Sequence, residues 1–304
     1  MNTFQWCFDR VFVDISGVDM KTVENALTDT VAPGGRYFPP NCTSKQKVAI
    51  VIPFRDRDKH LRLFLRHMHP FLQRQQLEYR IFVIELVRTV KFNRAMLMNI
   101  GFVEALKLDN FDCFVFHDVD LLPEDNRIPY SCAHMPRHLS VAVDKFKYKL
   151  PYQDILGGIC ALSTEHFKKV NGMSNIFFGW GGEDDDFRTR VYAKKLVVVR
   201  PSVKVARYTM IKHVRDHVKN KERVCLLKST KTRMRKDGLS NLKYRVRQLK
   251  LLPLYTLVLV SINQTEQLRA DEELYDIHKQ CLNSTETMKL DIAKKAQPPS
   301  NKTT

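Results

Sequence analysis

The sequence predicts an α/β protein whose mostly parallel sheet is flanked by helices. Two observations in the first half of the chain lead to this fold class. Short apolar, β-branched segments alternate with longer segments whose apolar residues recur at helical spacing. The lengths between them are those of strand–helix–strand units, which join parallel strands. With 304 residues, of which 44% are hydrophobic, the chain is long enough for one large domain or two small ones.

The first three elements are expected at residues 47–54, 55–75 and 79–87. KVAIVIPF (47–54) is apolar and β-branched, so it predicts a buried strand that is stopped by Pro53. The next segment predicts a helix, because its apolar residues fall on one face. That face carries Leu61, Phe64, Leu65 and Met68. YRIFVIELV (79–87) again predicts a strand.

A second helix is expected at residues 92–108 and a third strand at residues 111–122. FNRAMLMNIGFVEALKL is amphipathic, whereas FDCFVFHDVDLL is apolar and ends in carboxylates. In a parallel sheet, ligands bind outside the carboxyl ends of the strands. Arg55, Arg57 and residues 118–120 fall at such ends, so the sequence predicts a ligand site there.

The second half of the chain is less regular. A helical pattern covers residues 183–195, and residues 251–262 (LLPLYTLVLVSI) predict a buried strand. That stretch is too short for a membrane span and is broken by Pro253. After it the apolar periodicity is lost. We therefore divide the chain into an N-terminal stem segment (1–46), one folded domain (47–262) and a polar tail (263–304) that is expected to be disordered.

Positive charge is concentrated in one part of the chain. The formal net charge is +17, and residues 200–250 alone contain 17 basic against 3 acidic residues. Such a stretch suits a polyanion, a phosphate-bearing ligand or an anionic membrane surface, and it equally suits a solvated protein surface. Because no aromatic residues are interleaved as in known RNA-binding motifs, we do not expect nucleic-acid binding.

The cysteines and the sequons bear on the cellular compartment. Seven cysteines are an odd number, and none forms a C-x-x-C pair, so a zinc site is not expected. Cys160, Cys225 and Cys281 lack the context of a nucleophile and are interpreted as structural or incidental. No targeting signal is visible in the chain as given. Passage through the secretory pathway is suggested by four N-x-[ST] sequons, at Asn41, Asn263, Asn283 and Asn301.

Three groups of residues have the chemistry of a metal-dependent active site. Asp118 and Asp120 end an apolar strand, where a carboxylate needs a hydrogen bond, an ion pair or a cation; by strand alternation both should point to one side. They suit a hard divalent cation that also binds a diphosphate, although capping of the next turn is the simpler interpretation. Met210 and His213 could add a sulfur and an imidazole ligand, but such residues usually serve as core and surface residues.

The third group is GWGGEDDD, residues 179–186. Its adjacent carboxylates repel one another, so some should have a raised pKa and accept a proton. The glycines allow a hinged loop that carries Trp180 over a sugar. The same acidic residues also favour the first turn of a helix, and both interpretations can hold together. A glycine-rich phosphate loop is absent, so a diphosphate would be held by a metal and by cationic side chains.

These motifs occur in one order along the chain: PFRDR (53–57), FNRA (92–95), HDVDLLP (117–123), PRHLSVAVDKF (136–146), GWGGEDDD (179–186) and DGLSNLKY (237–244). In this combination the chain resembles the β-1,4-galactosyltransferase family, glycosyltransferase family 7, over about residues 34–262. Within the family it is most similar to the invertebrate β-1,4-N-acetylgalactosaminyltransferase branch. The resemblance implies a glycosyltransferase-A fold, with residues 47–262 as the catalytic domain, and an inverting transfer that uses Mn²⁺ and a UDP-sugar.

The resemblance also assigns roles to single residues. The Mn²⁺ ligands are Asp120, Met210 and His213. The catalytic carboxylates are Asp184, as the base, and Glu183. The donor contacts are Pro53, Phe54, Arg55, Arg57, Phe92, Arg94, Asp118, Val119, Ile155 and Trp180. The acceptor contacts are Asp185, Tyr152, Phe146, Gly181, Arg223, Val224 and Leu227. The disulfides are Cys113 with Cys132, and Cys7 with Cys42.

Ile155 stands where galactose-transferring members of the family have tyrosine, so we expect UDP-GalNAc as the donor. The expected acceptor is a terminal GlcNAc of a glycoprotein or glycolipid glycan. The alternatives are a UDP-Gal transferase with the same acceptor class and a catalytically silent carbohydrate-binding homologue. The family implies the Golgi lumen or secretion, with the membrane contacted only through an N-terminal anchor that is absent from this chain.

Overall fold

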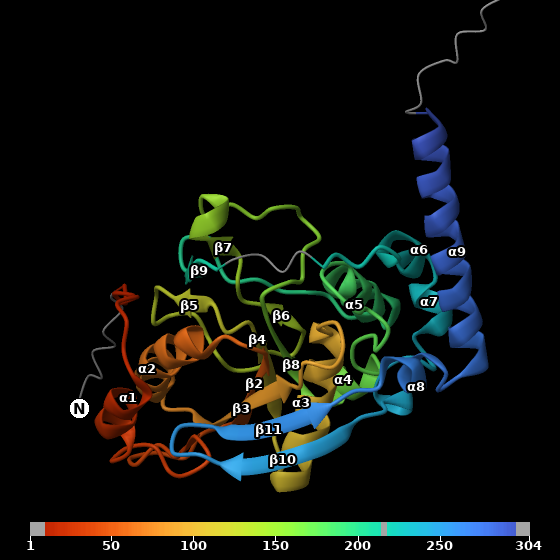
Figure 1. The fold of residues 1–304 in the computed structure, drawn as a ribbon. Helices are drawn as coiled ribbons and strands as arrows, with labels where there is room; N and C mark the ends of the chain where they lie inside the picture. Colours follow the sequence, from red (N-terminus) through yellow and green to blue (C-terminus); the bar gives the residue numbers. More distant parts are fainter. Residues whose placement is uncertain (1–9, 214–217, 296–304) are drawn as a thin grey trace, which may run out of the picture.

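A mixed sheet forms the centre of the molecule, and helices cover both of its faces (Figure 1). The computed structural model describes residues 10–213 and 218–295, with side chains up to residue 284. Within this part of the chain the strand order is β10-β11-β3-β2-β4-β8-β6, and β1 pairs with the start of β3. These strands are β1 (Arg36–Tyr37), β2 (Lys47–Phe54), β3 (Glu78–Leu86), β4 (Cys113–His117), β6 (Arg137–His138), β8 (Ile159–Ser163), β10 (Arg245–Leu251) and β11 (Thr256–Ser261).

The neighbouring strands β11, β3, β2 and β4 are parallel, which confirms the predicted parallel core. Two helices make the crossovers of the first half, α2 (Asp58–Arg74) and α3 (Arg94–Leu108). The remaining pairs of this sheet, β10 with β11, β4 with β8 and β6 with β8, are antiparallel. The sheet therefore ends in antiparallel strands on both sides of a parallel centre.

Alternate side chains of β2 enter two different cores. Val48 and Ile50 pack with the apolar face of α2, whereas Ala49 and Val51 pack with α3 on the opposite side. Both sets are fully buried, as expected for a central strand whose two faces are covered by helices. At Gly101 a Cβ atom would lie 2.3 Å from Cγ1 of Val51, so only glycine allows α3 to approach β2 this closely.

A second, smaller sheet lies at the edge of the first. It has the order β5-β9-β7, with β5 (Leu121–Pro123) antiparallel to β9 (Arg207–Met210) and β7 (Ala142–Val143) parallel to it. A 3₁₀ turn, η1 (Asp144–Phe146), follows β7. Two helices complete this half, α4 (Thr164–Lys169) and α5 (Glu183–Ala193), and α5 confirms the helix expected over residues 183–195.

The N-terminal stem segment contributes to the folded domain. Helix α1 (Met20–Leu27) buries Val23 and Leu27 in the same core as α2, and β1 joins the main sheet beside β3. Residues 1–9 lie outside the described part of the chain. In the described part of the chain, residues before the predicted boundary at residue 46 are therefore packed into the domain and do not form a separate stem.

The polar tail was predicted wrongly in its described part, because two helices follow β11. These are α8 (Gln264–Leu268) and α9 (Glu272–Lys295), and α9 runs beside α6 (Arg223–Lys228) and α7 (Thr230–Arg233) (Figure 1). Leu268 and Leu274 are buried, and Cys281 forms a disulfide with Cys225. The prediction failed because this segment buries only a few widely spaced apolar residues. The position of α9 also depends on a disulfide, which the apolar pattern of the segment does not indicate.

Residues 251–262 are not one strand. β10 ends at Leu251, a turn contains Pro253, and β11 begins at Thr256. The segment thus contains the end of one strand, a turn, and the whole of the next strand, which pairs antiparallel to the first. Proline lacks the backbone N–H that a continuous strand would need at this point. No helix among the described residues is long and apolar enough to cross a membrane.

One predicted disulfide is confirmed, Cys113 with Cys132, 19 residues apart in the sequence. The second predicted pair includes Cys7, which lies outside the described residues, and its proposed partner Cys42 is a free thiol at the surface. The Cys225–Cys281 bond was not predicted, since nothing in the sequence pairs two cysteines that are 56 residues apart.

Candidate active site

Three polar groups meet beyond the carboxyl ends of β2 and β4. Arg94, the first residue of α3, places its Nε 2.6 Å from Oδ1 of Asp118 and donates through Nη2 to the carbonyl of Gly158 at 2.9 Å. Its Nη1 lies 3.9 Å from Oε1 of Glu183. Asn93 holds the start of α3 in place, because its side chain caps the helix by accepting from the N–H of Met96. Arg94 thus joins the Asp118 turn to the acidic start of α5.

The turn that carries Asp118 and Asp120 differs from the prediction. β4 ends at His117, so both residues lie in the turn between β4 and β5 and do not alternate along one strand. Consequently Asp118 pairs with Arg94, whereas Asp120 contacts His213. The two carboxylates border one region from different sides.

Burial raises the pKa of the carboxylates in this region. The pKa of Glu183 is raised to about 7, chiefly by burial and then by the charge of Asp184, against the attraction of Arg94. Burial also raises the pKa of Asp118 to about 6, and it raises that of Asp184, with the charge of Asp185 adding to the effect. The sequence prediction that this acidic cluster contains proton-accepting groups with raised pKa values agrees with this result.

The predicted metal ligands come together around the end of β9. Nε2 of His213 lies 2.9 Å from Oδ2 of Asp120, and the backbone register of β5 with β9 sets Met210 opposite Leu121, next to Asp120. Two ligand atoms on adjacent corners of an octahedral cation with bonds of about 2.1 Å are separated by about 3 Å, so the Asp120–His213 distance fits a shared ion. Among the described residues no group of three or more His, Cys, Asp or Glu side chains is placed to hold a metal ion. Met210, the third predicted ligand, is not one of these residue types.

Other side chains position His213. Nη2 of Arg57 lies 3.1 Å from Nδ1 of His213, which leaves Nε2 directed at Asp120. The imidazole of His60, on α2, stands edge-on to the His213 ring and is hydrogen-bonded to the backbone of Lys212. Because a guanidinium only donates, Nδ1 of His213 is the acceptor in its contact with Arg57, and Nε2 carries the ring proton toward Asp120.

Asp184 and Ile155 both lie against Gly157. A Cβ atom at Gly157 would be 2.6 Å from Oδ2 of Asp184 and 3.7 Å from Cγ1 of Ile155, so a larger residue there would displace the carboxylate. The carbonyl of Ile155 accepts from Nη2 of Arg200 at 2.8 Å, which fixes the turn. The structure therefore brings the predicted base and the predicted donor-selecting residue to one place.

Exposed aromatic residues occur in both predicted contact sets, Tyr152 and Phe146 for the acceptor and Trp180 for the donor. Tyr152 donates from its hydroxyl to Oδ1 of Asp185 at 2.9 Å and is 44% exposed, and Trp180 is 60% exposed. Phe146, in η1, is also exposed. An exposed aromatic ring next to a carboxylate suits a sugar, whose ring has an apolar face and a polar edge.

The loop with Trp180 is paired with the segment before α6. The N–H of Trp180 donates to the carbonyl of Val218, and the N–H of Asn220 donates to the carbonyl of Trp180. Gly181 and Gly182 have φ values of +105° and +94°, which side chains other than glycine rarely adopt, and Arg223 packs over both. Val224 is exposed, and Leu227 is half-buried against the core.

The remaining predicted donor residues surround the end of β2. Arg55 lies over the ring of Phe92 and donates from Nη1 to the carbonyl of Val90 at 2.8 Å. Phe54 and Val119 are buried. Pro53 lies inside β2, which continues to Phe54 and is not stopped by this proline as predicted.

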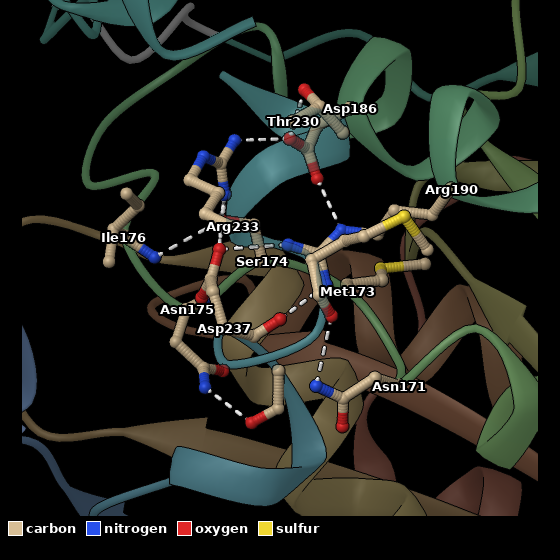
Figure 2. A network of polar contacts seen from close by, with 12 residues as sticks. Asn171, Met173, Ser174, Asn175, Ile176, Asp186, Arg190, Thr230, Arg233 and Asp237 are labelled. Atoms are coloured by element: carbon tan, nitrogen blue, oxygen red, sulfur yellow. Dashed lines mark hydrogen bonds and ion pairs between the residues drawn. The ribbon is translucent and has the colours of Figure 1, made fainter. Parts of the chain in front are cut away.

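A buried ion network holds α5 from behind the site, and the sequence analysis missed it. Figure 2 shows Asp186 between Arg190 and Arg233, and both arginines also pair with Asp237. All four side chains are fully buried. Burial alone would raise the pKa of Asp237, but Arg190 and Arg233 hold it below its ordinary value.

This network gives the acidic cluster two separate functions. Glu183, Asp184 and Asp185 border the site, whereas Asp186 anchors the first turn of α5 to α7. The signal that could have revealed it is the i, i+4 spacing of opposite charges, Asp186 with Arg190 and Arg233 with Asp237. It also accounts for one arginine of the basic stretch, Arg233, which serves internal ion pairs.

Glu183→Gln is expected to stabilise the protein at pH 8 and to change its stability little at pH 5. One carboxylate oxygen of Glu183, Oε2, is buried without a hydrogen-bond partner. Because its folded pKa is about 7 and its ordinary value is 4.5, the folded state binds more protons between these values. The free energy of unfolding therefore falls as pH rises through this window, and glutamine removes that loss.

The measurement is Tm at both pH values without donor or metal, with the exposed Glu165→Gln as a control that should show no pH-dependent difference. A Glu183→Gln variant with a lower Tm at pH 8 would mean that the attraction of Arg94 outweighs the cost of burial.

Comparison with known proteins gives one consistent family. Residues 7–133 match the family described as the N-terminal region of glycosyl transferase group 7, and residues 137–214 match the one described as the N-terminal domain of galactosyltransferase. Beta-1,4-galactosyltransferase 2 of Cricetulus griseus is 47% identical over 76% of this chain and 63% of its own length. Beta-1,4-galactosyltransferase 4 of the same species is 49% identical over 75% of this chain and 67% of its own length. The chain thus spans about two thirds of these relatives.

A solved structure has the same fold. It is a mutant of Drosophila beta-1,4-galactosyltransferase 7 in complex with manganese, UDP-Gal and xylobiose, with 30% sequence identity and a TM-score of 0.60. The match covers 74% of this chain and 99% of that one. Together with the parallel core strands and flanking helices, it confirms the predicted α/β, glycosyltransferase-A fold class.

Proposed function

This chain belongs to the β-1,4-galactosyltransferase family, glycosyl transferase group 7, and from that membership we propose that it is an inverting, metal-dependent hexosyltransferase. The observation that carries the proposal is the convergence of two groups at one edge of the sheet. Asp120, Met210 and His213 form a mixed-donor set, and a carboxylate cluster with raised pKa values lies across Arg94 from it. One group suits a metal-bound diphosphate, and the other suits removal of a proton.

Asp120, Met210 and His213 would hold Mn²⁺, whose oxygen, sulfur and nitrogen ligands differ from the all-oxygen set that Mg²⁺ prefers. When bound, this ion neutralises the charge that develops on the leaving diphosphate. Arg55, Arg57 and Arg94 add fixed positive charge around the same region and replace the missing glycine-rich loop. Arg94 also keeps Asp118 in place through its 2.6 Å contact.

Asp184 is the base in this proposal. The acceptor hydroxyl loses its proton to the Asp184 carboxylate while its oxygen forms a bond to the anomeric carbon, and the bond from that carbon to the diphosphate oxygen breaks. Attack from the face opposite the leaving group inverts the configuration. Asp184 suits this role better than Glu183, because Glu183 is the one that lies near Arg94, whereas Asp184 adjoins Asp185 and the exposed Tyr152. A raised pKa matches a base to neutral pH.

We further propose that the donor is UDP-GalNAc and that the acceptor is a terminal GlcNAc of a glycoprotein or glycolipid glycan. Ile155 is half-buried beside Gly157 and Asp184, where a tyrosine would place a hydroxyl in the space that an N-acetyl group needs. The UDP-Gal bound to the Drosophila relative makes UDP-Gal the alternative donor.

Ile155→Tyr is expected to shift the ratio of kcat/KM for UDP-GalNAc over UDP-Gal toward galactose by about 20- to 600-fold. Burying one methyl group is worth about 0.8 kcal/mol, and relief of a steric clash adds about 1–3 kcal/mol. Initial rates with both donors measure the ratio, and Ile155→Val serves as the control that should keep the GalNAc preference. An unchanged ratio in Ile155→Tyr would mean that residue 155 only fills space.

A transfer assay with UDP-GalNAc and UDP-Gal in parallel tests the proposed function. The acceptors are a GlcNAc-terminated glycoside and xylobiose, the ligand of the Drosophila relative. We expect one sugar residue to be added to the GlcNAc glycoside, which gives a disaccharide, with UDP-GalNAc as the better donor. Transfer to neither acceptor from either donor would favour the alternative of a silent carbohydrate-binding homologue.

We place the protein in the Golgi lumen or among secreted proteins. Two disulfides among the described residues and four sequons support this location, because disulfides persist in oxidising compartments. Peptide mapping without reductant on secreted material tests it, since a free thiol at Cys113 would contradict a secretory route.

A further inference from the structure

A disulfide outside the matched family regions joins the C-terminal helix to the predicted acceptor site. Cys225, on α6, is bonded to Cys281, on α9, and both lie beyond residue 214, where the second family match ends. α6 is the helix that carries Arg223, Val224 and Leu227. The residues proposed to contact the acceptor are therefore covalently linked to α9.

α6 needs outside support to keep its position. It has six residues and no side-chain hydrogen bond at its N-cap, Glu222, and a helix this short is not stable alone. On the side of the site it is held by the backbone pairing of Trp180 with Val218 and Asn220, and by the packing of Arg223 over Gly181 and Gly182. The loop on that side is rich in glycine and provides little rigidity by itself.

α9 provides support from the opposite side. Cys281 is 1% exposed and Leu226 is fully buried in the same apolar core, so the covalent link lies inside a packed contact. Nζ of Lys236, just after α7, lies 2.6 Å from Oε2 of Glu273 and 3.7 Å from Oδ2 of Asp271. Figure 1 shows α9 alongside α6 and α7, which agrees with these contacts. α9 is thus fixed to the domain at its start and to α6 one third of the way along.

We propose that α9 is a structural part of the acceptor site, and that the Cys225–Cys281 bond makes both cysteines positioning residues for acceptor binding. This proposal rests on the function proposed above. The bond holds α6 in a helical, docked state against residues 179–182. In that state the side chain of Arg223 packs over Gly181 and Gly182, directly after Trp180.

The donor side of the site should depend on this bond only through Trp180, whose loop pairs with the segment before α6. Most other predicted donor and metal contacts come from strands of the two sheets. Asp118 and Asp120 follow β4, Met210 ends β9, His213 follows it, and Arg55 and Arg57 follow β2. If the docked state of α6 falls to a third or a tenth of the molecules, the apparent KM for the acceptor rises by about threefold to tenfold. The apparent KM for the donor should stay within about twofold, because Trp180 is the one predicted donor contact whose loop pairs with the segment before α6 in the described residues.

The test compares Cys225→Ala/Cys281→Ala with wild type and with Cys42→Ala, which removes a free surface thiol and serves as the matched control. Acceptor KM, donor KM and the rate of donor hydrolysis are measured for each. We expect only the acceptor KM of the double variant to rise. An unchanged acceptor KM, or an equal rise for donor and acceptor, would overturn the proposal.

A second measurement does not depend on activity. Hydrogen exchange of the amides at residues 218–228 should be faster in the double variant than in wild type, while amides of α3 keep their protection. Equal protection of residues 218–228 in both proteins would overturn the proposal even if no donor or acceptor were found. If the wild type transferred no sugar but residues 218–228 still exchanged faster in the double variant, the proposed function would be rejected. The role of α9 as the support of α6 would remain.

Discussion

Asp184→Asn is expected to lower kcat by about 10²-fold or more, since general base catalysis commonly contributes 10²–10⁴-fold. Asparagine keeps the shape of the side chain against Gly157 and removes its ability to accept a proton. The KM of the donor should barely change, because most predicted donor contacts lie at the end of β2, at the start of α3 and in the turn after β4, and asparagine keeps the packing against Gly157 beside Ile155. Steady-state kinetics at saturating donor and acceptor measure the effect.

Asp154→Asn is the matched control for this variant. Asp154 is an exposed carboxylate two residues beyond Tyr152 that pairs with Arg188 at the surface, so its loss should leave kcat nearly unchanged. If Asp184→Asn turned over at the wild-type rate, the role of base would pass to Glu183, whose pKa is also raised.

Asp120→Ala is expected to abolish transfer and to leave Tm nearly unchanged. Asp120 is the one proposed metal ligand that carries a charge, and its carboxylate is 2.9 Å from His213. The carbonyl of Asp120 still accepts from the N–H of Ile211, so the backbone link between the turn and β9 survives the substitution. The measurements are transfer activity and Mn²⁺ affinity by titration of the free ion.

EDTA-treated wild type should behave like Asp120→Ala, and activity should return when Mn²⁺ is added back. Full activity of the wild type in EDTA would contradict a metal at this site. Retained Mn²⁺ affinity in Asp120→Ala would place the ion elsewhere.

The parallel core could be predicted from the sequence because its pattern is local. β2 and β4 are almost entirely apolar, β3 has an apolar central run, and α2 and α3 repeat apolar residues at helical spacing. Each element can therefore be recognised from its own residues. The meeting of Arg94 with Asp118 follows from that topology, because Arg94 comes after β3 and Asp118 after β4, and residues after parallel strands meet at one edge. The position of Glu183 does not, because α5 begins after α4 and a loop that follow the antiparallel β8.

Features that depend on distant partners could not be predicted in this way. The turn at Asp118–Asp120 begins one residue after a strand whose apolar pattern continues through it, so alternation suggested the wrong geometry. α9 contains few apolar residues, and its fixed position depends on Cys281 and Lys236, whose partners are far away in the sequence or on another helix. Asp186 resembles its three acidic neighbours in sequence, and only the buried Arg190 and Arg233 distinguish it.

Analysis of the linkage and anomeric configuration of the product by NMR tests the central claim most directly. Wild-type protein is incubated with UDP-GalNAc, a GlcNAc glycoside and Mn²⁺, and the purified product is assigned. We predict a single β-configured GalNAc linked to O4 of GlcNAc, formed only when Mn²⁺ is present. An α-configured product, a linkage to another hydroxyl, or equal product formation in EDTA would contradict an inverting, metal-dependent β-1,4 transfer at the Asp184 and Asp120 site.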